Sequence, residues 1–318
     1  MRTCRSPHCF PTTLGRRLRK ALVTVAKWLW VVLVLVAAAA VIWRSRDDVA
    51  RMFAQVPLWL MGTSFMLLVG AKLLLGENAR IAAHHSGITL GYGAATRLYN
   101  ISQLGKYLPG SIWQFVGRAA AYRSRGAEYA QIRDALLTES LWIVAAAFCI
   151  GGLLCGPALV SIISQSLSPV VAWWLLGLGG GVVLAGCGLL LWRRAAFLRY
   201  LRSAVPTPRA VLVQIAVWSL LGGSFWVLVR ACGMEAGLLF SIGLFSAAYA
   251  IGFLVPIAPA GLGIRDGMLT LGLLPFAPPG EAVAVTVVAR LIYLLVELFL
   301  VAVQDPVAKL VAHRERAG

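Results

Sequence analysis

Long runs of apolar residues alternate with short basic or glycine- and proline-rich stretches along this chain of 318 residues. Six runs reach about 18 residues or more, the length that lets an α-helix cross the hydrocarbon core of a bilayer. They lie near residues 22–43, 56–76, 136–155, 170–192, 210–229 and 282–303. The pattern predicts an all-α polytopic membrane protein with six full crossings.

Two other apolar segments carry glycine, proline and charge in their middle. One contains Gly105-Lys106-Tyr107-Leu108-Pro109-Gly110, and the other, about 150 residues later, contains Pro259-Ala260-Gly261-Leu262-Gly263-Ile264-Arg265-Asp266. A broken helix in lipid leaves backbone groups without hydrogen-bond partners unless protein or water covers them. Paired interruptions at corresponding places in two halves of a chain are therefore typical of a transport site.

A shift of about 150 residues superimposes the pattern of the first half on that of the second. It brings the spans at 22–43 and 56–76 onto those at 170–192 and 210–229, and the interrupted segment at 90–118 onto 240–268. We therefore predict a first membrane repeat and a second, inverted one, each with three crossings and one re-entrant hairpin. The predicted boundaries are 1–21 for a basic tail, 22–155 and 156–303 for the repeats, and 304–318 for a second basic tail.

The first interrupted segment is too short for two crossings. Residues 90–118 number 29, whereas two crossings need about 40, so this segment is predicted to enter and leave the membrane on one side. Basic residues follow it, which predicts opening to the cytoplasm, while the uncharged stretch 275–280 after the second segment predicts opening to the outside. The length of 238–274 also permits two short crossings as an alternative.

Composition agrees with a membrane protein, because 60% of the residues are hydrophobic and 13% are charged. The formal net charge of +17 would suit nucleic acid, but the basic residues concentrate in the two tails and the central loop. Cytoplasmic loops of membrane proteins have this bias, so we expect no nucleic-acid partner and both termini in the cytoplasm. Cys4, His8 and Cys9 form a loose group in a basic tail, and we expect neither a metal nor a cofactor.

Charges within apolar spans need a reason, since each costs about 2.5–3.5 kcal/mol on insertion scales. Arg290 and Glu297 are seven residues apart, so they share one helix face with Tyr293 between them. Lys72 has no partner evident in the sequence and is expected to extend toward the cytoplasmic end of its helix.

The candidate substrate-binding residues follow from these charges and from the interruptions. They are Lys106, Tyr107, Pro109, Gly110, Trp113, Gln114, Arg118, Glu139, Pro259, Gly261, Gly263, Arg265, Asp266, Arg290 and Glu297. In one interpretation the cations and the free N–H groups of the helix ends bind a phosphate or another anion of a lipid head group. The carboxylates would then orient those cations or meet a cationic head group. In the other, the charges are structural ion pairs that hold the two halves together.

The first interruption carries a resemblance to a known family. The stretch from Asn100 to Gln114, followed by Gly117-Arg118, resembles the signature of the flippase-like membrane family. That family includes the transmembrane flippase domain of lysylphosphatidylglycerol synthases of the MprF type and stand-alone YbhN- and AglD-like relatives. The second motif resembles the family's P-x-G-x-G-x-R-E, with Asp266 where glutamate is usual.

The resemblance implies a bacterial cytoplasmic-membrane protein that moves lipids or lipid-linked molecules between leaflets. No counterpart of the soluble aminoacyltransferase domain follows the last span, so lysyl transfer is not expected. Membrane lipids are the expected partners, with a lipid-modifying enzyme or glycosyltransferase as a further candidate. Two alternatives remain: a membrane-embedded transferase using Glu139 or Asp266 as a base on a polyprenyl-phosphate or phospholipid, and a non-transporting subunit of a lipid-modifying system.

Overall fold

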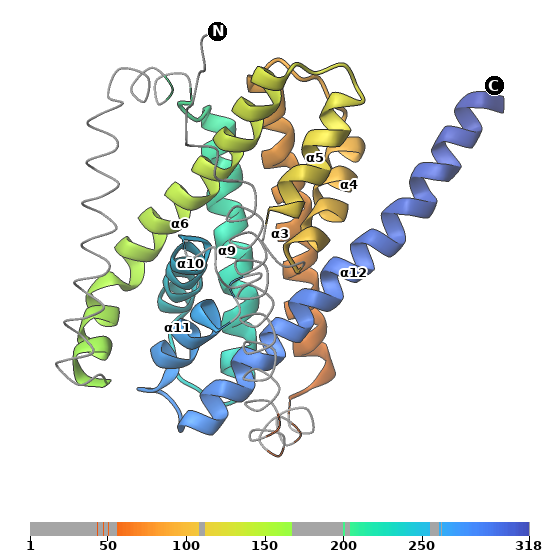
Figure 1. Ribbon diagram of the computed structural model, residues 1–318. Helices are drawn as coiled ribbons and strands as arrows, with labels where there is room; N and C mark the ends of the chain where they lie inside the picture. Colours follow the sequence, from red (N-terminus) through yellow and green to blue (C-terminus); the bar gives the residue numbers. More distant parts are fainter. Residues whose placement is uncertain are drawn as a thin grey trace, which may run out of the picture.

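The structure is a computed structural model, and it describes Trp43, Asp47, Ala50, Tyr200, Gly261 and residues 56–107, 112–166, 204–254 and 263–317. Within these residues the chain forms eight α-helices and one short 3-10 helix, without β-strands. The elements are α3 (Leu58–His85), α4 (Tyr92–Gln103), η1 (Leu104–Tyr107), α5 (Trp113–Arg123), α6 (Tyr129–Ser166), α9 (Pro208–Ala231), α10 (Leu238–Leu254), α11 (Ile264–Leu273) and α12 (Pro279–Ala317). They pack into one helical bundle (Figure 1).

Four of the helices, α3, α6, α9 and α12, are long and apolar enough to cross a membrane. They contain the predicted spans at 56–76, 136–155, 210–229 and 282–303 almost completely, and each continues beyond them. The predicted spans at 22–43 and 170–192 lie outside the described residues, apart from Trp43. The prediction of an all-α membrane protein is therefore confirmed for the part of the chain that the structure describes.

Local signals in the sequence set the ends of these helices. The helix α9 begins after Thr207, whose hydroxyl accepts a hydrogen bond from the Ala210 N–H at 3.2 Å, and Pro208 takes the first helical position. The helix α3 ends before Gly87, which has a φ of 81°. Glycine adopts this left-handed conformation at little cost, and so it ends the helix.

Corresponding helices of the two halves begin at a constant spacing. The starts of α3 and α9, at Leu58 and Pro208, are 150 residues apart, as are those of α6 and α12, at Tyr129 and Pro279. The starts of α5 and α11 are 151 residues apart. The order of these helices therefore repeats at the spacing that the shifted sequence pattern predicts, although α4 and α10 differ in length, with 12 and 17 residues.

The two equivalent helices α3 and α9 pack against each other and run antiparallel. The hydroxyl groups of Ser64 and Ser224 are 2.8 Å apart, while Glu77, further along α3, pairs with Arg209 at the start of α9 at 2.7 Å. Around them, the core is built from apolar side chains of α3, α9, α10 and α12, with Trp218 and Tyr249 in an edge-to-face contact at 5.0 Å. Counterparts from the two halves thus form the centre of the bundle.

Both interrupted segments form pairs of short helices. The 12 residues of α4 and the 11 of α5 reach roughly 18 Å and 16 Å, about half of a hydrocarbon core. The second segment divides into α10, with 17 residues, and α11, with 10. In the view of Figure 1, α4 and α5 lie in the upper part of the bundle and α10 and α11 in the lower part. Re-entry of either segment into a membrane stays a prediction.

Candidate functional site

The Glu297 carboxylate on α12 lies at the centre of a buried group of charges. It is 1% exposed and accepts hydrogen bonds from Lys72 of α3 and Lys106 of η1, both on Oε1. The Tyr107 hydroxyl donates to the other oxygen, Oε2, at 2.8 Å. One carboxylate thus connects α12 with α3 and with the first interrupted segment.

The expectation that Lys72 extends toward the cytoplasm was wrong. Its side chain is fully buried and donates to the Tyr293 hydroxyl at 2.8 Å in addition to its ion pair with Glu297. The partner is 225 residues away in the sequence. Burial is tolerated because the ammonium group finds an anion and a hydroxyl acceptor inside the protein, which removes the need to reach water.

Three cations surround the ring of Tyr293. The ammonium groups of Lys72 and Lys106 lie 4.1 Å and 4.8 Å from the ring centroid, and the guanidinium carbon of Arg265 lies 4.9 Å from it. An aromatic face attracts cations within about 6 Å. We call Lys72, Lys106, Arg265, Tyr293 and Glu297 the Tyr293 cluster.

Arg265 differs from the other members of the Tyr293 cluster. It is the second residue of α11, it is 7% exposed, and its guanidinium also lies 4.9 Å from the Phe245 ring of α10. Its Nε is buried without a hydrogen-bond partner, and no carboxylate among the described residues pairs with it. A buried, unneutralised guanidinium is unfavourable, so this position calls for an anion.

A second charged contact joins α5 to α6. Arg118 donates from Nη1 to both oxygens of Glu139, and both side chains are buried. The guanidinium carbon of Arg118 also lies 5.2 Å from the Tyr99 ring. This Arg118–Glu139 pair is buried, with the Arg118 Nε left without a hydrogen-bond partner among the described residues, and it holds the end of the first interrupted segment to the following long helix.

A third charged contact joins α11 to α12. Arg290 donates from Nη1 to both oxygens of Asp266, each at 2.8 Å, and both side chains are partly exposed. The Asp266 carboxylate also accepts a hydrogen bond from the Gly263 N–H at 3.4 Å, which helps to fix the start of α11. The Asp266–Arg290 pair therefore corresponds in the repeat to the Arg118–Glu139 pair.

The described residues of these three groups carry unequal numbers of positive and negative charges. Five are cations, Lys72, Lys106, Arg118, Arg265 and Arg290, and three are carboxylates, Glu139, Asp266 and Glu297. Tyr249 on α10 lies close enough to interact electrostatically with Lys72, Arg265 and Glu139, and Arg290 lies close enough to act on Tyr107, so the three groups are neighbours. With ordinary ionisation the site has an excess of two positive charges.

Comparison with known proteins adds the family to this geometry. The family model described as the lysylphosphatidylglycerol synthase TM region matches residues 28–300. The chain belongs to this family. The match confirms the resemblance carried by the two interrupted motifs, and it makes the chain a multi-pass membrane protein related to lipid modification or flipping. Among curated proteins, no match was found.

The other motif residues that the family resemblance singled out are spread over the two interruptions. Trp113 and Gln114 form the first turn of α5, where the Trp113 ring is exposed. Gly261 and Gly263 precede α11 with φ values of 69° and 86°. Pro109, Gly110 and Pro259 lie outside the described residues, as do Cys4, His8 and Cys9. Among the residues described, no three His, Cys, Asp or Glu side chains gather as metal ligands would.

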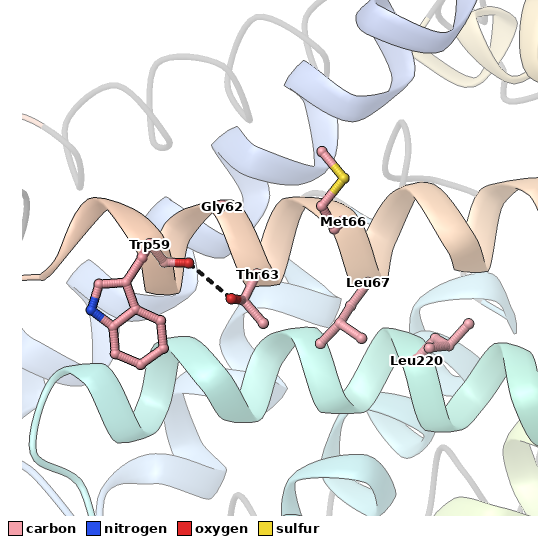
Figure 2. A pocket seen from close by; sticks show the side chains of 6 residues that line it. All are labelled: Trp59, Gly62, Thr63, Met66, Leu67 and Leu220. Atoms are coloured by element: carbon pink, nitrogen blue, oxygen red, sulfur yellow. Dashed lines mark hydrogen bonds between the residues drawn. The ribbon is translucent and has the colours of Figure 1, made fainter.

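An open groove of about 500 Å³ lies between α3 and α9, away from the charged groups of this family member. It is lined by Trp59, Gly62, Thr63, Met66, Leu67 and Leu220 (Figure 2). The Thr63 hydroxyl donates to the Trp59 carbonyl at 2.8 Å, which satisfies it within its own helix. None of the residues of the Tyr293 cluster lines this groove, so the groove is part of the apolar outer surface and not of the candidate site.

Sequence reasoning missed Lys72, and it gave Tyr293 no part in binding. The available signal for Lys72 was its place in the middle of an apolar span, where a charge costs free energy unless a partner is present. For Tyr293 the signal was its place on the helix face between Arg290 and Glu297. Neither signal identifies the partner, because helical periodicity assigns a residue to a face without naming the helix opposite.

Proposed function

We propose that this protein carries a phospholipid or a lipid-linked molecule between the leaflets of a membrane. The observation that supports this most directly is the composition of the Tyr293 cluster. Lys106 comes from the first interrupted segment and Arg265 from the second, and both lie against Tyr293 of α12. A site shared by two interrupted segments is suited to face one side of a membrane and then the other.

The arrangement of the helices supports an inverted repeat as part of this proposal. The equivalent helices α3 and α9 are antiparallel neighbours, as a two-fold axis in the membrane plane would require. In the proposed topology the first interrupted segment opens to the cytoplasm and the second to the outside. Both termini are then in the cytoplasm of a bacterial cell, and the protein lies in the cytoplasmic membrane.

We propose transport without covalent change of the lipid. Glu139 and Asp266, the two carboxylates considered as catalytic bases, each accept two hydrogen bonds from an arginine on a neighbouring helix. These contacts give both carboxylates a structural task. Membrane lipids are the proposed partners, and a lipid-modifying enzyme that supplies or receives the lipid is a further proposed partner.

Reconstitution into vesicles with head-group-labelled lipids tests this function. The wild-type protein is expected to expose inner-leaflet label to a membrane-impermeant quencher faster than empty vesicles do, with the label still on the intact lipid. Arg265→Ala and Glu139→Gln are expected to slow the exchange. Arg133→Ala is the control, because Arg133 is on the same helix as Glu139 but is exposed. Exchange no faster than in empty vesicles would contradict the proposal, and a changed lipid would indicate an enzyme.

Single cysteines test the topology. Ser111→Cys and Gly280→Cys, each introduced into a variant without the six natural cysteines, are expected to react with impermeant reagents from the cytoplasmic side and from the outside, respectively. Reaction of both positions from the same side would overturn the inverted repeat while leaving lipid transport to be judged by the vesicle assay.

A further inference from the structure

Three cations and one carboxylate meet around Tyr293, and this imbalance is the starting point. We propose that the Tyr293 cluster is a binding site for a lipid phosphate ester in which Glu297 occupies part of the place of the ligand. The phosphate binds Arg265 and replaces Glu297 as the ion-pair partner of Lys106. Lys72 remains paired with Glu297. The proposal rests on the proposed transport function and adds to it the class of substrate and an internal competitor.

Lys106 is less buried than Lys72 and has fewer hydrogen-bond partners among the described residues. Lys72 is fully buried in the long helix α3 and donates to both Glu297 and Tyr293. Lys106 is 12% exposed and lies in a four-residue 3-10 helix next to the interruption, where it donates to Glu297. A 3-10 stretch has poorer hydrogen-bond geometry than an α-helix. Lys106 is therefore the cation that can change partners, and Glu297 is left with Lys72 when it does.

Arg265 supplies the geometry that a phosphate needs. Its planar guanidinium presents several donors in a fixed fork, which matches the oxygens of a phosphate better than an ammonium group does. Its Nε is buried without a partner, and it is the second residue of the 10-residue helix α11, whose first N–H groups favour an anion. The positive charge of Arg265 and its hydrogen-bond donors therefore both suit a phosphate group.

The net charge of the site indicates which kind of lipid phosphate fits it best. The Arg118–Glu139 and Asp266–Arg290 pairs are each neutral, so the excess of two positive charges belongs to Lys72, Lys106 and Arg265 against Glu297. A phosphate monoester with up to two negative charges cancels this excess. A zwitterionic head group cancels less of it, because its own cation must then be accommodated. The expected preference is phosphatidic acid, then phosphatidylglycerol, then phosphatidylcholine.

Binding to the purified full-length protein in detergent tests the ligand class. The probes are short-chain phosphatidic acid, short-chain phosphatidylcholine, a short-chain diacylglycerol without phosphate, and inorganic phosphate, each titrated while the midpoint of thermal unfolding is followed. Phosphatidic acid is expected to bind at least about tenfold more tightly than phosphatidylcholine, the effect of one charge-assisted hydrogen bond. Equal binding of diacylglycerol overturns the phosphate site, and equal binding of inorganic phosphate overturns its assignment to a lipid.

Two substitutions test the roles of Arg265 and Glu297. Arg265→Met is expected to weaken phosphatidic acid binding by about 10- to 100-fold, while the thermal midpoint without ligand stays or rises because an unpartnered buried charge is removed. Glu297→Gln is expected to lower the midpoint without ligand and yet to tighten phosphatidic acid binding, because the competing carboxylate is gone. A purely structural Glu297 predicts weaker binding in that variant.

The controls keep this inference separate from the transport function. Arg133→Ala should leave both measurements unchanged. If Glu297→Gln does not fold, the test rests on Arg265→Met alone. Unchanged phosphatidic acid binding in the Arg265→Met variant then overturns the proposal. If the protein binds phosphatidic acid but does not exchange lipids between leaflets, the proposed phosphate site would stand and the proposed transport function would be wrong. If Arg265→Met leaves leaflet exchange unaffected and the exchange shows no preference for an anionic lipid, the transport function would stand and the proposed phosphate site would be wrong.

Discussion

The Arg118–Glu139 pair and the Asp266–Arg290 pair occupy corresponding places in the two halves, yet they differ in charge order and in exposure. In the first, the short helix α5 supplies the cation and the long helix α6 the carboxylate, whereas in the second α11 supplies the carboxylate and α12 the cation. The side chains are 2% and 2% exposed in the first pair and 20% and 22% exposed in the second. The repeat therefore preserves the connection between helices while each half sets its own electrostatic environment.

The largest expected difference between the two pairs is in the free energy of unfolding. Glu139→Gln leaves the buried Arg118 charge without an anion and should lower this free energy by about 3–5 kcal/mol. Asp266→Asn acts on a partly exposed pair and should cost about 1 kcal/mol or less. Denaturant or thermal unfolding of the purified protein in detergent measures both, with Arg133→Ala as control. Equal losses would show that the exposure of a pair does not govern its contribution.

A double replacement tests whether the unpaired Arg118 charge causes the loss of unfolding free energy in Glu139→Gln. Arg118→Met combined with Glu139→Leu removes both charges and fills a similar volume with apolar groups. Such replacements of buried ion pairs are often neutral or stabilising. The double variant should therefore recover most of the stability that Glu139→Gln loses, in the same unfolding measurement. A double variant as unstable as Glu139→Gln would instead place the loss in packing.

Salt should have the smallest effect, and it should act on one pair alone. At 1 M ionic strength the screening length falls to about 3 Å, which weakens partly exposed pairs more than buried ones. The cost of Asp266→Asn should shrink by a few tenths of a kcal/mol, roughly the range of exposed pairs, between low and high salt. The cost of Glu139→Gln should stay constant. A salt-dependent cost at Glu139 would mean that water reaches the Arg118–Glu139 pair.

The sequence predicted positions along the chain better than it predicted neighbours in space. Hydropathy located four spans that the structure describes, because about 20 apolar residues in succession have few other structural meanings. Glycine and proline located both interruptions, after Tyr107 and Leu254, because these residues disfavour a continuous helix. The same signals account for the two pairs of helix starts that are 150 residues apart, one start of each pair in each half.

The pairings of the charges could not be predicted in this way. Arg290 and Glu297 do lie on one helix, but seven residues separate them, roughly 10 Å along its axis, and they bind different partners. Arg290 pairs with the neighbouring α11, and Glu297 pairs with lysines from the other half. Identifying these partners needed the positions of the facing helices, which the sequence pattern does not give. Among the residues that the structure describes, Arg118 pairs with Glu139, whereas Arg265 has no carboxylate partner.

The close contact at Gly105 fixes how η1 lies against α5. A Cβ atom at Gly105 would lie 2.7 Å from the backbone nitrogen of Gln114, so η1 rests directly on the first turn of α5. Lys72 meanwhile fastens α3 to α12 through Glu297 and Tyr293. Two sets of contacts therefore meet at Glu297: Lys72 joins α3 to α12, and Lys106 joins η1, which lies against α5, to the same carboxylate. A side chain larger than glycine at position 105 would have to displace either the first turn of α5 or η1, and with η1 the position of Lys106.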